Sequence, residues 1–426
     1  MSLFFGAIFR RSTYIYRTHV EIVDLDNGFV GRQIAQSALL LSAAAAAGDQ
    51  PVWRIRNDLT TLAATKEWVR RHGWAALVIN PGASARLTGA LSGNPTFYNP
   101  ADAATLILST GRHPIIEESF IQPAVLTISQ AVQQEFSASF IRQQLIINPS
   151  AAAASNLVTL ATQPIAFHTT DAAPMGFGIS PVVYLFSFLV GQLCVIGTLI
   201  TWKMTTFPFF LKVKHTQLWL GTIALVVSWA IYLGMLSALA ISAFRGSQYT
   251  ALALRYTVGR FFSLWFTTTM VLATGGLWLA SWFLLLTPDL IPLASLSMVL
   301  PNVASTLTTT VTAPRFYRWF YALPFYNGSM LYRYILSGGY PKIGLNLGVC
   351  LGELFLWCIL LWLSTWVRQY TVICGKGDMV GWYRGNIFFA TPVKKEEEEE
   401  TSSAAPLSIT DSANDETSLR IGNLGV

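Results

Sequence analysis

Hydrophobic and polar positions divide the chain into two parts with different patterns. Up to about residue 175, short apolar runs alternate with stretches of helical periodicity. Alternating strand and helix patterns favour a small layered α/β domain, which we place at residues 1–175. The expected strands are 19–25, 52–55, 74–79, 106–109 and 164–169, and the expected helices are 31–47, 60–72, 84–91 and 115–144.

The second part contains apolar stretches long enough to cross about 30 Å of hydrocarbon, which takes about 20 residues. The candidate spans are 179–202, 218–244, 261–286, 290–311 and 345–367. The fourth is the weakest, because Pro292 and Pro301 interrupt it and hydroxyl residues crowd its end. The alternative for this stretch is a re-entrant or interfacial segment buried in protein. The pattern therefore predicts an α-helical multi-pass membrane domain of about five helices over residues 176–375.

An aromatic segment, residues 314–340, precedes the last span. Ten of its residues are Phe, Tyr or Trp, with three arginines among them. Because amphipathic aromatic side chains prefer the level of the lipid headgroups, we expect short helices that lie on or dip into the membrane interface. The motif that marks this interface is Arg318, Trp319, Pro324, Phe325 and Asn327. Asn327 also begins a glycosylation sequon, which we expect to be unused so close to the bilayer.

Composition agrees with this division. Only 12% of the residues are charged, against about 25% in soluble proteins. The net charge of +6 comes from scattered Arg and Lys, so a nucleic-acid partner is not expected. The cysteines lie in or just after apolar segments, and we expect them to act as small packing residues. They are Cys194, Cys350, Cys358 and Cys374.

Charge counting does not orient the spans. With the N-terminal domain outside, about six basic residues fall on the inner side and seven on the outer side, so the positive-inside rule decides nothing. Residues 376–426 carry a run of five glutamates followed by a Ser, Ala, Thr and Asp-rich stretch. Such a composition cannot bury enough apolar surface to fold, and we expect a largely disordered acidic tail.

Motifs for enzymatic chemistry are not evident. The Gly-Lys pair at Gly375 lacks the spacing of a nucleotide-binding loop, and the five histidines show no metal-ligand spacing. A faint calcium-loop pattern at residues 23–28 has its glycine one position early and no closing Glu. We therefore expect no catalytic residues, no metal, no cofactor and no ATPase domain in this chain.

Two features of the last span suggest a role. Gly344, Gly348 and Gly352 recur every four residues, a spacing that lets a neighbouring helix approach closely, within the chain or across a homodimer. Glu353 follows directly. Because ionisable groups inside a membrane are costly, it is either a contact for substrate or protons, or a buried carboxyl that bonds to a neighbour.

The opening residues 2–11, the segment HVEIVDLDNGFVG at 19–31 and the segment RFYRWFYALPFYNG before the last span resemble the fungal nitrosoguanidine-resistance family. That family carries a domain of unknown function and is similar in plan to ABC-2 type permeases and bacterial phage-infection proteins. The resemblance covers roughly residues 1–375. It implies one N-terminal helix, an extracytoplasmic domain, five further helices and a cytoplasmic C-terminus.

The resemblance also implies a function. We expect a plasma-membrane or endomembrane protein that exports or redistributes lipids or amphiphilic drugs, with membrane lipids as partners. The alternative is a non-transporting regulator or scaffold that affects lipid asymmetry or trafficking. The first helix of the family plan is missing from this sequence, and we expect that it was lost from the start of the gene model.

Overall fold

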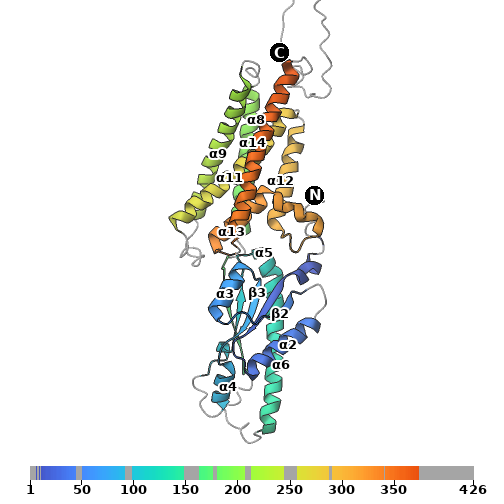
Figure 1. The fold of residues 1–426 in the computed structure, drawn as a ribbon, viewed down its shortest axis with the longest axis vertical. Helices are drawn as coiled ribbons and strands as arrows, with labels where there is room; N and C mark the ends of the chain where they lie inside the picture. The colour runs from blue at the N-terminus through green and yellow to red at the C-terminus, as the bar shows by residue number, and fades with distance from the viewer. Residues whose placement is uncertain are drawn as a thin grey trace, which may run out of the picture.

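The computed structural model describes residues 6, 9, 11–44, 50–91, 98–147, 163–175, 180–206, 213–243, 257–286, 290–339 and 341–373. The described chain forms two parts stacked along the long axis (Figure 1). We call residues 11–175 the sheet unit and residues 180–373 the bundle. The predicted tail at 376–426 and Cys374 lie outside the described residues.

The sheet unit is built on one five-stranded sheet. Its order is β2-β1-β3-β4-β5, with β1 parallel to β2 and β3, β3 antiparallel to β4, and β4 parallel to β5. The strands are β1 (His19–Asp24), β2 (Val52–Ile55), β3 (Ala75–Ile79), β4 (Ala104–Leu108) and β5 (Phe167–Asp171). Each lies within a few residues of a strand predicted from the sequence.

Helices cover both faces of this sheet. Alternate side chains of β3 point to opposite faces, so Leu77 joins one apolar cluster and Val78 another. Three helices pack on the Leu77 face, α2 (Phe29–Ala44), α4 (Ala83–Leu91) and α6 (Gln122–Ile147), and α3 (Leu62–Arg71) packs on the other. Because β3 and β4 are covered on both faces, every residue in them is buried. Short helices complete the unit: η1 (Ser12–Arg17), η3 (Pro100–Asp102), α5 (Pro114–Ile116) and the π-helix η4 (Glu117–Ile121).

The chain enters β1 and leaves β5 at the same ends of the strands. We call this side of the sheet, which faces the bundle, the common edge. β1 begins there at His19. β1 runs parallel to β3, β3 runs antiparallel to β4, and β4 runs parallel to β5. The end of β5, Asp171, therefore lies at this edge as well. Close to this edge, the main-chain amide of Gly111 donates to the carbonyl of Ala173 at 2.7 Å.

Four helices of the bundle are long and apolar enough to span a membrane. They are α8 (Ser180–Thr206), α9 (His215–Ala243), α11 (Val258–Leu285) and α14 (Ile343–Ile373). α11 is central, with 72% of its most apolar window buried, whereas the corresponding share is 22% for α9 and 17% for α14. Helices that are apolar on all sides and yet mostly exposed within their own chain require an apolar solvent. The chain is therefore a membrane protein.

The helix at the predicted fifth span, 290–311, is shorter than the prediction. The helix there, α12 (Ile291–Leu307), has 17 residues, which gives a length of roughly 25 Å. Its chain then turns extended at Thr308, and four of the five residues 308–312 are buried threonines. Thr308 to Thr312 cannot continue a span, because the extended segment packs against the sheet unit through Val311.

The aromatic segment also differs from its prediction. It forms η8 (Arg315–Ala322) and α13 (Pro324–Ser337). η8 exposes Phe316 and Trp319, as an interfacial helix would, but most of α13 is buried against α8, α11, α12 and α14. The reason is that α12 ends short of the sheet unit, and α13 fills the space that remains at this end of the bundle.

Candidate functional site

Arg333 of α13 joins the bundle to the sheet unit. Its side chain is 2% exposed. One terminal nitrogen, Nη2, donates to the hydroxyl of Tyr184 at 3.0 Å and to the carbonyl of Thr306 at 3.1 Å, and Nη1 donates to the carbonyl of Arg112 at 3.3 Å. The guanidinium thus connects α8, α12, α13 and the sheet unit. A planar group with five donors suits such a junction, and a lysine could not replace it.

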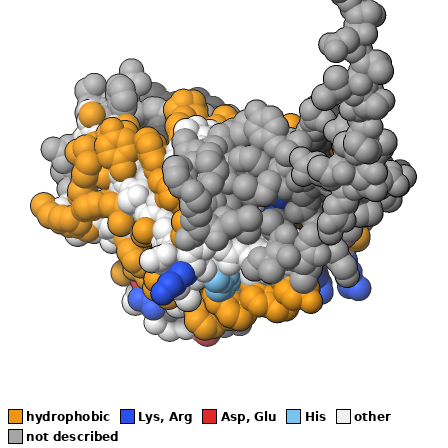
Figure 2. Space-filling view, turned by 90° about the horizontal axis from the view of Figure 1, so that it is seen from above, with side chains coloured by type: hydrophobic (Ala, Val, Ile, Leu, Met, Phe, Trp, Pro, Cys, Tyr) orange, Lys and Arg blue, Asp and Glu red, His pale blue; other side chains and the backbone are white. Residues whose placement is uncertain are grey.

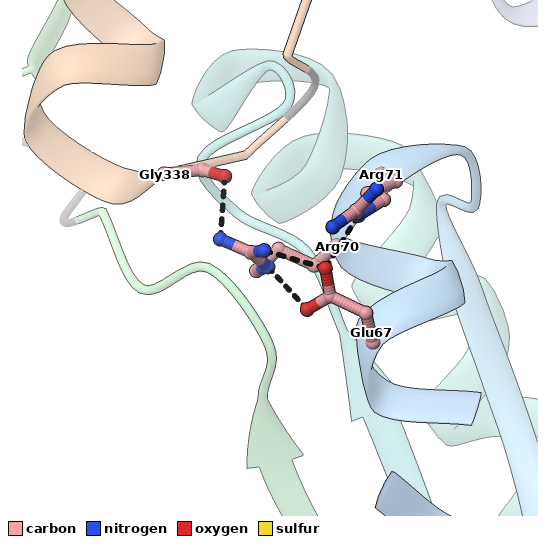
Figure 3. A network of polar contacts seen from close by, with 4 residues as sticks. All are labelled: Glu67, Arg70, Arg71 and Gly338. Carbon is pink, nitrogen blue, oxygen red and sulfur yellow. Dashed lines mark hydrogen bonds and ion pairs between the residues drawn. The ribbon is translucent and has the colours of Figure 1, made fainter. Parts of the chain in front are cut away.

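A second contact supports the same junction on the other side of the sheet (Figure 3). Arg70 at the end of α3 donates to the carbonyl of Gly338, which ends α13 in a left-handed conformation with φ of 74°. Glu67 holds Arg70 through two hydrogen bonds of 2.7 and 2.5 Å and also pairs with Arg71. These two arginines lower the pKa of Glu67 to about 2. The network is partly exposed, so its contribution to stability is small.

Close approach of the two parts also requires a glycine. A Cβ on Gly111 would lie 2.1 Å from the hydroxyl oxygen of Ser337 and 2.7 Å from the carbonyl oxygen of Ala173. No side chain fits in that space. Any larger residue at 111 would push α13 away from the edge of the sheet.

Two ionisable side chains are completely buried near this junction. Burial and the nearby charges of Arg333 and Arg11 hold the pKa of His113 well below its usual value, so the imidazole is neutral. Burial raises the pKa of Glu117 to about 8, and one of its oxygens accepts the amide of Ser109 at 3.4 Å. The carboxyl is therefore mostly protonated at neutral pH. The net charge of this junction comes from its arginines.

Polar side chains continue from this junction into the apolar bundle. Tyr332 and Thr268 hydrogen bond through their hydroxyls between α13 and α11. Asn302, inside α12, accepts the amide of Phe325 at 3.1 Å and donates to the carbonyl of Met298 at 2.8 Å. We call this set the polar column; its members are Tyr184, Gln192, Thr268, Asn302, Tyr332 and Arg333.

Gln192 is the innermost member of the polar column. Its side chain on α8 is 0% exposed, and neither its amide nitrogen nor its amide oxygen has a hydrogen-bond partner among the described residues. It faces α11 so closely that a Cβ on Gly275 would lie 2.5 Å from the amide oxygen and 2.4 Å from the terminal methyl of Met298. An unpaired amide in a membrane interior is costly, which makes it a candidate for function.

The residues predicted from the last span lie elsewhere. Glu353 is half-buried on α14, and its Oε2 is buried with no hydrogen-bond partner among the described residues. Gly344, Gly348 and Gly352 are exposed, and a Cβ on any of them would meet nothing within 4 Å. The close packing expected from their spacing is therefore not made within the described chain. Contact across a homodimer stays a prediction.

The predicted interface motif divides into two groups. Arg318 and Trp319 are exposed on η8. Pro324, Phe325 and Asn327 are buried on α13, where Phe325 packs on Phe188 and Asn327 donates to two carbonyls at 2.9 Å. An asparagine that is 2% exposed and bonded in this way does not offer its amide for glycosylation.

Sequence reasoning missed most of the polar column. Gln192 and Asn302 carry a signal that could have found them, because each is a lone amide in an otherwise apolar stretch. Tyr184, Thr268 and Tyr332 carry none, since such residues are common in spans. Only the packing of α13 shows that they face one another.

The family described as "Protein of unknown function (DUF3533)" matches residues 1–363. This chain belongs to that family. Membership therefore covers both the sheet unit and nearly all of the bundle. No curated protein and no solved structure matches the chain.

Proposed function

We propose that this membrane protein moves lipids or amphiphilic drugs between the leaflets of a bilayer or out of the cell, on a plan like that of ABC-2 permeases. The observation that carries the proposal is the polar column, and Gln192 in particular. Buried polar groups within spanning helices ordinarily mark the path of a substrate or an ion. A lipid headgroup that crosses the bilayer needs such groups, because hydrocarbon offers it no hydrogen bonds.

Two other features support this proposal. The short helix α12, with Pro301 inside it, ends at Leu307, and the extended residues that follow it are enclosed by protein. Exposed apolar side chains cover much of the described surface of the bundle seen in Figure 2. Amphiphiles in the bilayer can therefore contact the bundle directly. In the orientation that we propose, the sheet unit is extracytoplasmic, the C-terminus is cytoplasmic and the membrane is the plasma membrane or an endomembrane.

The second candidate is a non-transporting regulator or scaffold that alters lipid asymmetry through partners. The close junction between the sheet unit and α13 favours it, because Arg333 could carry a change in the sheet unit into the bundle. The two candidates differ in whether the purified chain moves lipid by itself.

Reconstitution of the purified full chain tests the proposal. Vesicles are loaded with a fluorescent phospholipid, and a membrane-impermeant reductant reports the label that reaches the outer leaflet. We expect faster loss of protected label than in protein-free vesicles. No difference for phospholipid or labelled drug, with altered lipid distribution in cells that lack the protein, would replace transport by the scaffold role.

The Glu353→Gln variant tests the candidate contact on α14. Gln keeps the shape of the side chain but cannot take or release a proton, so transport is expected to fall at least tenfold. Leu351→Ala, two residues away on the same helix and 45% exposed, is the matched control. Normal transport by a well-expressed Glu353→Gln variant would make Glu353 a packing residue.

A further inference from the structure

The end of α12 nearest the sheet unit is covered by η8. Leu293 and Leu300 lie seven residues apart on one side of α12, and both are exposed. Because the chain is a membrane protein, this side of the helix faces lipid. Ala304, four positions further along on the same side, is buried in one apolar cluster with Tyr317 and Phe320 of η8. η8 therefore lies where the lipid-facing side of α12 ends.

The two remaining sides of η8 are exposed and differ in chemistry. A 3₁₀ helix has three residues per turn, so side chains three positions apart lie above one another. One row of side chains holds Phe316 and Trp319, which are 69% and 39% exposed. The other row holds Arg315 and Arg318, both exposed, and continues to Tyr321. Adjacent aromatic and basic rows are typical of a helix that lies in the interface between hydrocarbon and headgroups.

The N-terminal helix η1 lies beside η8 and carries the same residue types. Arg17 of η1 donates to the carbonyls of Val311 and Ala313 at 3.3 and 3.0 Å, just before η8 begins. The same guanidinium lies 4.4 Å from the ring centre of Tyr14, and the neighbouring Tyr16 is 45% exposed. η1 is thus fixed against the start of η8 and extends its aromatic surface. We call η1 and η8 together the collar.

The sequence around the collar is positively charged. Residues 1–20 include three arginines and residues 290–339 another three, and neither range contains Asp or Glu. Anionic lipid headgroups have the complementary charge, and a guanidinium can bind a phosphate through two parallel hydrogen bonds. Arg315 and Arg318 are exposed at the edge of the lipid-facing surface, where headgroups lie.

We propose that the collar binds the membrane surface on the side of the sheet unit and selects anionic phospholipids there. Phe316 and Trp319 enter the outer part of the hydrocarbon layer, while Arg315 and Arg318 bind lipid phosphates. The sheet unit then lies directly on the headgroups, and α12 ends at the membrane surface. This binding holds whether or not the chain itself moves lipid.

Depth-dependent quenching of Trp319 tests the position of the collar, because bromine quenches the fluorescence of tryptophans that it contacts. The full chain and its Trp319→Phe variant are reconstituted in vesicles of phosphatidylcholine brominated either near the headgroup or near the end of the acyl chain. The difference between the two chains is the signal of Trp319. We expect the shallow bromines to quench this signal several-fold more strongly. Equal quenching at both depths, or none, would overturn the proposal.

Brominated phosphatidylserine tests the selection of anionic lipid, with the signal of Trp319 again obtained by difference. We expect half-maximal quenching at a several-fold lower mole fraction of shallow-brominated phosphatidylserine than of shallow-brominated phosphatidylcholine. Arg318→Gln should raise the midpoint for phosphatidylserine about fivefold, the effect of one basic residue at an anionic surface. Adding Arg315→Gln should abolish the preference between the two lipids.

The matched control is Arg32→Gln, which removes an exposed arginine at the start of α2, away from the common edge. It should leave both midpoints unchanged. Equal midpoints for the two lipids in the native chain, or an unchanged preference in the double variant, would overturn the selection of anionic lipid. Vesicles in which the collar binds in this way but no lipid moves would refute transport and leave the collar as proposed.

Discussion

Gln192→Leu is expected to stabilise the protein and to impair transport. Leu has a similar volume and fills the position between Gly275 and Met298 without an amide. An unsatisfied buried polar group costs about 1–3 kcal/mol. Because helices separated in a membrane also find polar partners, we take the lower end, about 1 kcal/mol. That gain corresponds to a rise in Tm of about 2–4 °C.

Thermal unfolding in detergent, followed by tryptophan fluorescence at constant protein concentration, measures this gain. Transport is measured in parallel on the reconstituted variant. Thr198→Val, on the exposed side of the same helix, is the control and should change neither property. A drop in Tm of several degrees would refute the reasoning, since it would mean that the amide of Gln192 makes hydrogen bonds that stabilise the fold. A higher Tm with normal transport would remove Gln192 from the substrate path.

Arg333→Met is expected to lower the free energy of unfolding by about 3 kcal/mol, because Tyr184 and Thr306 lose a charged donor. Chemical unfolding measures this, and Arg333→Lys should restore only part of it. Glu117 ionises with a pKa of about 8 in the fold and 4.5 when unfolded. Its contribution to stability is therefore fully present below pH 4.5 and is lost as the pH rises through about 8. Glu117→Gln should flatten that part of the pH profile of Tm.

Each of these two predictions has a clear contrary result. Stability of Arg333→Met equal to that of Arg318→Lys, an exposed control on η8, would show that the junction does not depend on the buried guanidinium. Coincident pH profiles of Tm between pH 5 and 8 for the native chain and for Glu117→Gln would mean that burial does not raise the pKa of Glu117 in the fold.

The sequence was a good guide to local structure and a poor one to packing. The strands of the sheet unit and four of the spans could be predicted, because periodicity and length are properties of one segment at a time. The bounds of α12 could not, since Thr308 leaves the helix to pack against the sheet unit, and that contact joins residues far apart in the chain. The position of α13 failed for the same reason: its aromatic residues suit an interface, yet they fill a protein interior equally well.

The candidate site shows the same division. Glu353 and the glycines stand out in the sequence because their residue types are rare in such places. The junction at Arg333 depends on three carbonyl or hydroxyl partners from three segments. These partners come together only in the folded chain, and no spacing in the sequence predicts it.

The common edge at which the chain enters and leaves the sheet has a consequence for how this protein can change. The described segments that lead from the sheet to the bundle lie at that edge, and the opposite edge carries turns such as those at Asn27 and Gly82, both with positive φ. Length added at those turns does not alter the spacing of the two ends of the unit. The sheet unit is attached to the bundle along one edge. We therefore expect relatives to differ most in the loops at the opposite edge, and a reporter domain inserted there to be tolerated.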